Sequence, residues 1–145
     1  MGEVLSSFNP LNAYRQTNIK TASQGKLIIM LYDEAIKQLN LAVEQIEQHS
    51  LKLDGINNAI IRAQEMITEL MVSLDFEKGG EIAQTLFSLY MFFNRQLMEA
   101  NMKKEAEPIR QVSSLLQELR EAWIQVVHKE RGGADTLPGG VNIAG

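Results

Sequence analysis

The chain has 145 residues, of which 45% are apolar and 22% charged, a composition typical of one globular domain. Its net charge is −4 and no run of Lys or Arg exceeds two residues, so the sequence gives no support to a nucleic-acid partner. The absence of cysteine excludes disulfides and thiolate metal sites, and it fits the cytosol. Because no stretch approaches the ~18 consecutive apolar residues of a membrane span, we expect no membrane insertion.

Hydrophobic periodicity divides the chain into three parts. Residues 1–20 form an N-terminal segment with a short helix that begins near Pro10, residues 21–130 form a helical bundle, and residues 131–145 form a flexible Gly-rich tail. The N-terminal helix is too short to be stable alone. It is either a static cover on the core or a lid that moves aside when a ligand arrives.

Four longer helices are predicted in the bundle, with apolar residues three or four positions apart in each. The first runs from Thr21 or Ser23 to about Gln48, and the second from Asp54 to Leu74. Gly79-Gly80 separates the second helix from the third helix, which begins near Glu81 and ends near Lys103-Lys104. The fourth begins around Glu105 to Pro108. Short connections between them predict an all-α fold, an antiparallel up-and-down four-helix bundle.

Patterns that support catalysis or cofactor binding are missing from the sequence. A di-iron bundle needs Glu-x-x-His pairs, and neither His49 nor His128 follows a glutamate by three residues. Gly79-Gly80 lacks the spacing and the Lys-Ser/Thr of a phosphate loop. No nucleophile is paired with a base. We therefore expect a protein that is not an enzyme and has no metal, cofactor or catalytic residue.

The segment from Leu86 to Phe93 is apolar at every position except Ser88. A helical run of this length covers all sides of the helix, so it cannot face one core. Two interpretations fit: this is the most central helix, or part of it lines a groove for an amphipathic partner helix. In the second case Leu86, Leu89 and Phe93 face inward. Phe87, Tyr90 and Met91 then lie on a flank with Asn94 and Met98.

Several motifs of the chain resemble the FliS family of flagellar secretion chaperones. The resemblance covers roughly residues 12–127, and a Gln at position 24 stands where the family usually has Pro. The matching stretches are Ala13-Tyr14, Thr21-Ala22-Ser23, Leu27 to Asp33, Ile67 to Met71, Ser73-Leu74-Asp75, Gly79 to Ala83, Leu89-Tyr90, Leu97, Ala100-Asn101 and Leu119 to Trp123.

This resemblance implies a cytosolic export chaperone. Such a protein binds the disordered C-terminal segment of flagellin, holds it as a helix, blocks premature polymerisation and keeps it competent for secretion. It also makes the flagellar export apparatus a candidate second partner. The residues expected to form the flagellin groove are Tyr14, Leu27, Met30, Leu31, Tyr32, Phe87, Tyr90, Met91 and Asn94.

Three other hypotheses remain at this stage. The first is a metal-carrying or enzymatic bundle, and the second is a structural subunit that polymerises with itself. The third keeps the fold but makes the chain a helical-bundle adaptor for another flagellar or regulatory protein, since a groove for amphipathic helices is rarely exclusive.

Overall fold

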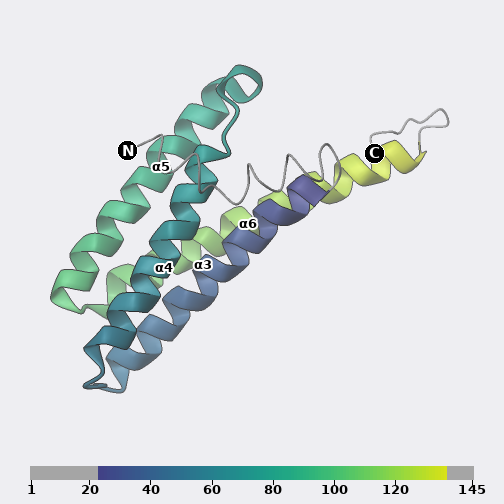
Figure 1. Ribbon diagram of the computed structural model, residues 1–145. Helices are drawn as coiled ribbons and strands as arrows, with labels where there is room; N and C mark the ends of the chain where they lie inside the picture. The colour runs from purple at the N-terminus through teal and green to yellow at the C-terminus, as the bar shows by residue number, and fades with distance from the viewer. Residues whose placement is uncertain (1–22, 137–145) are drawn as a thin grey trace.

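The computed structural model describes residues 23–136, which form four α-helices and, within that range, no strand. They are α3 (Ser23–Glu47), α4 (Leu53–Val72), α5 (Phe76–Lys103) and α6 (Ala106–Thr136). Each helix packs against the next one in the chain, and α6 packs against α3. Figure 1 shows the resulting up-and-down bundle, in which α3 and α6 lie side by side and diverge from α4 and α5 at the end where α3 begins. The predicted fold class is confirmed.

The predicted N-terminal helix and residues 1–20 lie outside the described part of the chain. Within residues 23–136, no helix carries an apolar stretch long enough to cross a membrane.

Helical periodicity accounts for the core. In α4, the side chains of Ile56, Ile60, Ala63, Ile67 and Leu70 are all buried, and they follow the spacing of three or four residues seen in the sequence. The other helices contribute similar stripes. The largest fully buried side chains are Tyr32, Tyr90, Phe93, Leu39, Ile56, Ile60, Ile67, Leu70, Leu97, Ile109 and Leu116. One continuous apolar core therefore runs through the bundle.

Left-handed residues end two of the helices. His49, with φ 53°, follows α3, and the amide N–H of Ser50 donates to the Gln45 carbonyl at 3.0 Å. Lys104, with φ 54°, follows α5, and the amide of Glu105 donates to the Ala100 carbonyl at 3.1 Å. Both bonds close the last turn in the Schellman manner, which allows the chain to reverse direction within a few residues.

The N-terminus of α5 differs from the prediction. The helix begins at Phe76 rather than near Glu81, because the Asp75 carboxylate caps it by accepting a hydrogen bond from the Lys78 amide at 3.0 Å. Gly80 does interrupt the helical backbone, with φ 51° and ψ −124°, but this makes a kink within α5 and not the connection between two helices. The Gly-Gly pair was correctly read as a break and wrongly read as a helix boundary.

The end of α6 also lies beyond the expected boundary. The helix continues through Gly132 and Gly133 to Thr136, whereas the sequence predicted a flexible tail from Arg131. Residues 137–145 lie outside the described range.

Candidate partner-binding surface

The apolar run in the middle of α5 divides between the core and the surface. Phe93 is fully buried, and Leu86 and Leu89 are half-buried against the core, as predicted. Phe87, Met91 and Phe92 are exposed. One helix therefore contributes large apolar side chains to both the interior and the outer face, which explains why the run shows no polar face of its own.

The exposed residues continue beyond the run as a line along α5, which we call the α5 strip: Phe87, Met91, Met98 and Met102. Their side chains are 37%, 43%, 54% and 78% exposed, respectively. Their spacing of four, seven and four residues keeps them within an arc of about 60° on a helix that turns 100° per residue. The strip is ~22 Å long at 1.5 Å per residue, which matches four turns of a partner helix.

A polar seam joins α5 to α4 beside the strip. The Asn94 side-chain amide donates to Thr68 Oγ1 at 3.2 Å, and the Gln64 side-chain amide donates to the Asn94 carbonyl at 3.1 Å. Two turns further, Asn101 Nδ2 donates to Asn57 Oδ1 at 2.7 Å. These bonds orient α5 about its axis, and they place Asn94, which lies between Met91 and Met98 in the sequence, against α4. Ile61, exposed on α4, follows the same helical line as Gln64 and Thr68.

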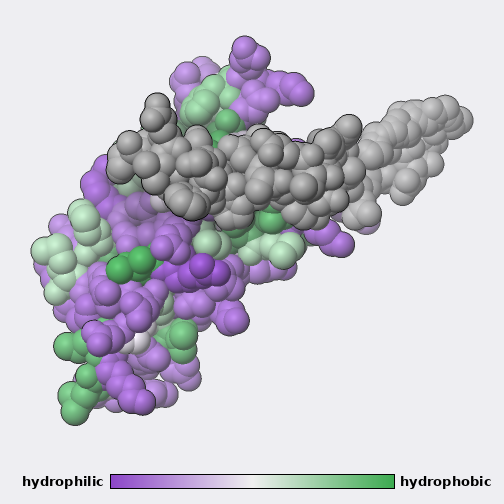
Figure 2. Space-filling view, viewed as in Figure 1, coloured by the Kyte–Doolittle hydropathy of each residue, from purple (hydrophilic) through white to green (hydrophobic). Residues whose placement is uncertain are grey.

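The kink at Gly80 extends the apolar surface at one end. The first turn of α5 carries Phe76, which is exposed and meets Phe87 edge to face, with ring centroids 5.9 Å apart. Apolar patches lie among hydrophilic ones along the α5 side of the molecule in Figure 2. The surface that begins at Phe76 thus continues through Phe87 into the strip.

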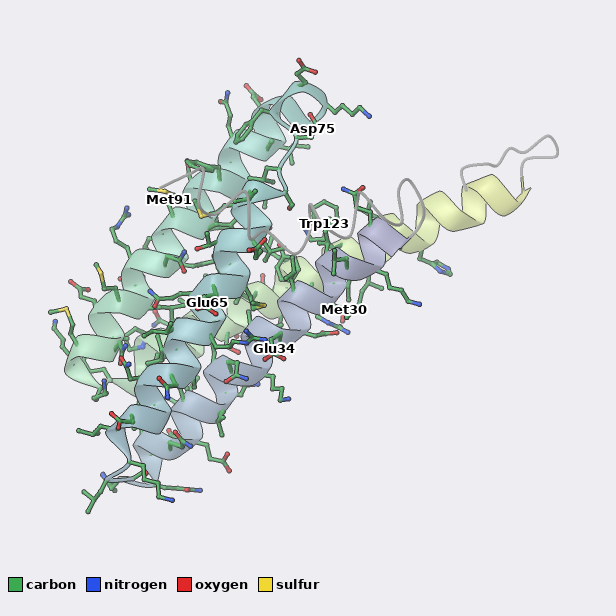
Figure 3. All side chains as sticks on the ribbon, viewed as in Figure 1. Met30, Glu34, Glu65, Asp75, Met91 and Trp123 are labelled. Atoms are coloured by element: carbon green, nitrogen blue, oxygen red, sulfur yellow. The ribbon has the colours of Figure 1, made fainter. Side chains whose placement is uncertain are left out.

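The structure distributes the predicted groove residues over three environments. Phe87 and Met91 lie in the strip, and Asn94 lies in the seam beside it. Met30 is exposed on α3, well away from Met91, with α4 drawn between them in Figure 3. Leu27 is half-buried on α3. Tyr14 lies outside the described residues.

Three predicted groove residues belong to the core instead. Leu31, Tyr32 and Tyr90 are buried, so their expected place on an open surface is wrong. Tyr90 turns inward because its hydroxyl hydrogen-bonds that of Tyr32, a partner on the diagonally opposite helix. Burial raises the pKa of both hydroxyls, the proximity of Tyr90 raises that of Tyr32 further, and hydrogen bonding with Trp123 partly offsets the increase. The pair is therefore neutral and structural.

Comparison with known proteins identifies the family. The family model described as "Flagellar protein FliS" matches residues 7–130. The chain is 32% identical over 123 residues to a flagellar secretion chaperone FliS of Bacillus subtilis, covering 85% of this chain and 90% of that protein. It is 37% identical over 124 residues to the flagellar secretion chaperone FliS of Salmonella typhimurium, covering 82% of this chain and 90% of the relative. The chain belongs to the FliS family.

Membership in the FliS family favours a role without catalysis. The relatives of this FliS-family chain are named chaperones, which is a non-enzymatic role. Among the side chains that the structure describes, no three His, Asp or Glu residues are grouped so that they could hold a metal ion.

Sequence reasoning missed part of the exposed surface of this FliS-family chain. Met102, Phe76 and Ile61 were not predicted, and Met98 was placed on the flank without being assigned to the groove. The repeat of four, seven and four residues from Phe87 through Met102 was the signal that could have found the strip. Phe76 had no such signal, because its contact with Phe87 depends on the kink.

Proposed function

We propose that this FliS-family protein is a cytosolic export chaperone that binds the disordered C-terminal segment of flagellin as an amphipathic helix along the α5 strip. Covering the apolar face of that segment would block premature polymerisation and keep flagellin competent for secretion. The export apparatus, at which the cargo is released, is the proposed second partner. The relatives named flagellar secretion chaperones support a flagellar cargo.

The observation that carries the proposal is the α5 strip itself. Four large apolar side chains lie in line on one helix, and none of them is needed to fill the core. Three of the four are methionines, whose flexible thioethers adapt to the shape of a partner side chain. A partner helix with apolar residues at intervals of three and four would match this line.

The α3 residues Leu27 and Met30 remain part of the proposal as a separate contact. Met30 is 57% exposed, and it lies on the far side of α4 from the strip. A segment that engages both surfaces must cross α4. A single straight helix cannot do this, so the cargo would need at least two helical pieces joined by a bend.

Titration calorimetry with a peptide of the last ~40 residues of flagellin from the same organism tests this function. Coupled folding and binding predicts a negative heat-capacity change and a gain of helical circular dichroism. Peptides from other flagellar proteins test the adaptor hypothesis in the same assay. If flagellin peptide at high concentration produces no heat and no helix, the flagellin assignment is wrong.

Substitutions locate the cargo on the strip. Met91→Asp and Met98→Asp should each weaken binding by about tenfold or more, because a charge replaces an apolar contact worth ~1.4 kcal/mol or more. Both side chains are exposed, so the bundle should keep its melting temperature. Leu115→Asp is the matched control, since Leu115 on α6 is 38% exposed, close to the 43% of Met91. Equal weakening by all three variants would rule out a specific role for the strip.

A further inference from the structure

Methionine carries all the sulfur of this protein. The chain has seven methionines and no cysteine, so no thiol competes for an oxidant. Three of the seven, Met91, Met98 and Met102, are exposed together on the α5 strip. Met66, in contrast, is only 9% exposed within the core. Three exposed thioethers are therefore gathered on the surface proposed to hold the cargo, and Met30 on α3, 57% exposed, lies apart from them.

The reaction of such a thioether with hydrogen peroxide is a two-electron oxygen transfer. A sulfur lone pair attacks one peroxide oxygen, the S–O bond forms and the O–O bond breaks. The departing hydroxide takes up the proton of the oxygen now bound to sulfur and leaves as water. Sulfur is oxidised, peroxide is reduced, and a flexible apolar side chain becomes a polar sulfoxide.

We propose that the α5 strip is a reversible oxidation site, at which peroxide converts Met91, Met98 and Met102 to sulfoxides and thereby weakens docking of the partner helix. This inference rests on the proposed function, because it names a chemical regulation of the same surface. It follows from the composition of the strip, in which Phe87 is the single member without sulfur. Oxidation removes most of the apolar contact while leaving the core untouched.

The fold should survive the modification. The three thioethers contribute little to the interior, whereas the residues facing inward at the same level of α5 are Tyr90, Phe93 and Leu97, which are fully buried and contain no sulfur. Oxidised protein should therefore retain its helical circular dichroism and its melting temperature. Loss of binding together with loss of helix would point instead to oxidation of Met66 in the core or of Met71 packed against it.

A pair of variants of the full chain separates the strip from the other exposed methionine. The triple variant Met91→Leu, Met98→Leu and Met102→Leu keeps an apolar strip of similar volume without sulfur. Met30→Leu removes the exposed α3 thioether and keeps the strip. Each protein is treated with hydrogen peroxide, the peroxide is removed with catalase, and the flagellin C-terminal peptide is then titrated. Peptide mapping by mass spectrometry reports which methionines gained oxygen.

We expect oxidation to reduce the peptide affinity of wild type and of Met30→Leu much more than that of the triple variant. Oxidised wild type and oxidised Met30→Leu should bind at least about tenfold more weakly than their untreated forms, since burying a sulfoxide loses the apolar gain of a methionine. The triple variant, which among the described residues keeps only the exposed thioether of Met30 outside the strip, should lose much less affinity on treatment than wild type does. Methionine sulfoxide reductases A and B, supplied with a dithiol, should restore wild-type affinity.

Two results would overturn the proposal while leaving the proposed function intact. In one, wild type carrying all three sulfoxides binds as tightly as untreated protein. In the other, the oxidised triple variant loses affinity as much as oxidised wild type does. Failure of every untreated protein to bind the peptide is a different outcome, and it would remove the proposed function and this inference together.

Discussion

At the scale of single residues, Glu69 is a glutamate whose position in the bundle is energetically unfavourable. It is buried on α4, and its Oε1 atom has no hydrogen-bond partner. Burial, together with the negative charge of Glu65 one turn away, raises its pKa from 4.5 to about 7. The neighbouring Arg62 pairs with Glu34 and Glu65 and leaves Glu69 uncompensated. This carboxylate therefore costs stability whenever it is ionised.

The raised pKa of Glu69 predicts a pH-dependent stability. Below pH 4.5 the carboxyl is protonated in both the folded and the unfolded chain, so it costs nothing. Between pH 4.5 and 7 the unfolded chain ionises first, and stability falls as pH rises. Glu69→Gln should therefore raise the free energy of unfolding at pH 8 by on the order of 2 kcal/mol and change it little at pH 4.

Urea unfolding of the wild type and of Glu69→Gln across this pH range measures the difference. Glu118→Gln, a substitution at an exposed glutamate of α6, is the control, and it should leave the pH profile unchanged. Parallel profiles for the wild type and Glu69→Gln would contradict the assignment of the penalty to Glu69.

At the scale of elements, the ends of the helices decide how tightly the chain reverses. His49 and Lys104 occupy the left-handed position that glycine usually fills, with φ values of 53° and 54°. Lys104 is partly compensated, because its ammonium donates to the Asn101 carbonyl at 2.7 Å and to the Asn101 side-chain oxygen at 2.5 Å. His49 is exposed. The backbone strain at His49 can therefore be removed by substitution without losing side-chain hydrogen bonds of the kind that Lys104 makes.

His49→Gly should stabilise the protein by about 0.5–1 kcal/mol, because glycine adopts the left-handed conformation without a Cβ clash. Gln48→Gly is the matched control one residue earlier, where φ is not positive. That control should destabilise the protein, since glycine there only adds freedom to the unfolded chain. Thermal unfolding followed by circular dichroism compares the two. A lower melting temperature for His49→Gly than for wild type would show that the left-handed backbone of His49 does not cost stability.

At the scale of the whole molecule, two contacts set how the four helices sit together. Gly25 lets α3 approach α6, since a Cβ built there would lie 2.7 Å from Val127 Cγ2. The Tyr32–Tyr90 hydroxyl pair joins α3 to α5 across the bundle, and it fixes which side of α5 faces inward. The orientation of the α5 strip thus depends on a contact between residues 58 positions apart.

The hydroxyl pair predicts non-additive substitutions. Tyr32→Phe or Tyr90→Phe alone leaves one buried hydroxyl without its partner and should cost about 1–2 kcal/mol. The double variant loses both hydroxyls together, so it should cost less than the sum of the two by about 1 kcal/mol. Urea unfolding followed by the fluorescence of Trp123, the single tryptophan of the chain, measures the cycle. Strict additivity would show that the two hydroxyls do not interact.

The four helices of the bundle, their faces and most of the core could be predicted from the sequence, because apolar spacing along a helix is a local property. The stripe of α4 from Ile56 to Leu70 is an example. The kink at Gly80 could be recognised as a break but not placed, since the Asp75 cap starts α5 ahead of it. The candidate surface was predicted in part: Phe87 and Met91 are exposed, while Tyr90 between them is not.

What the sequence determined by itself was therefore a set of amphipathic helices joined by short turns, and with them the FliS family. What only the tertiary structure decided was the rotation of α5, which has apolar residues on every side between Leu86 and Phe93. Periodicity cannot orient such a helix, because no polar face marks the side turned to water. The Tyr32 hydroxyl and the seam around Asn94 orient it instead, through partners on other helices.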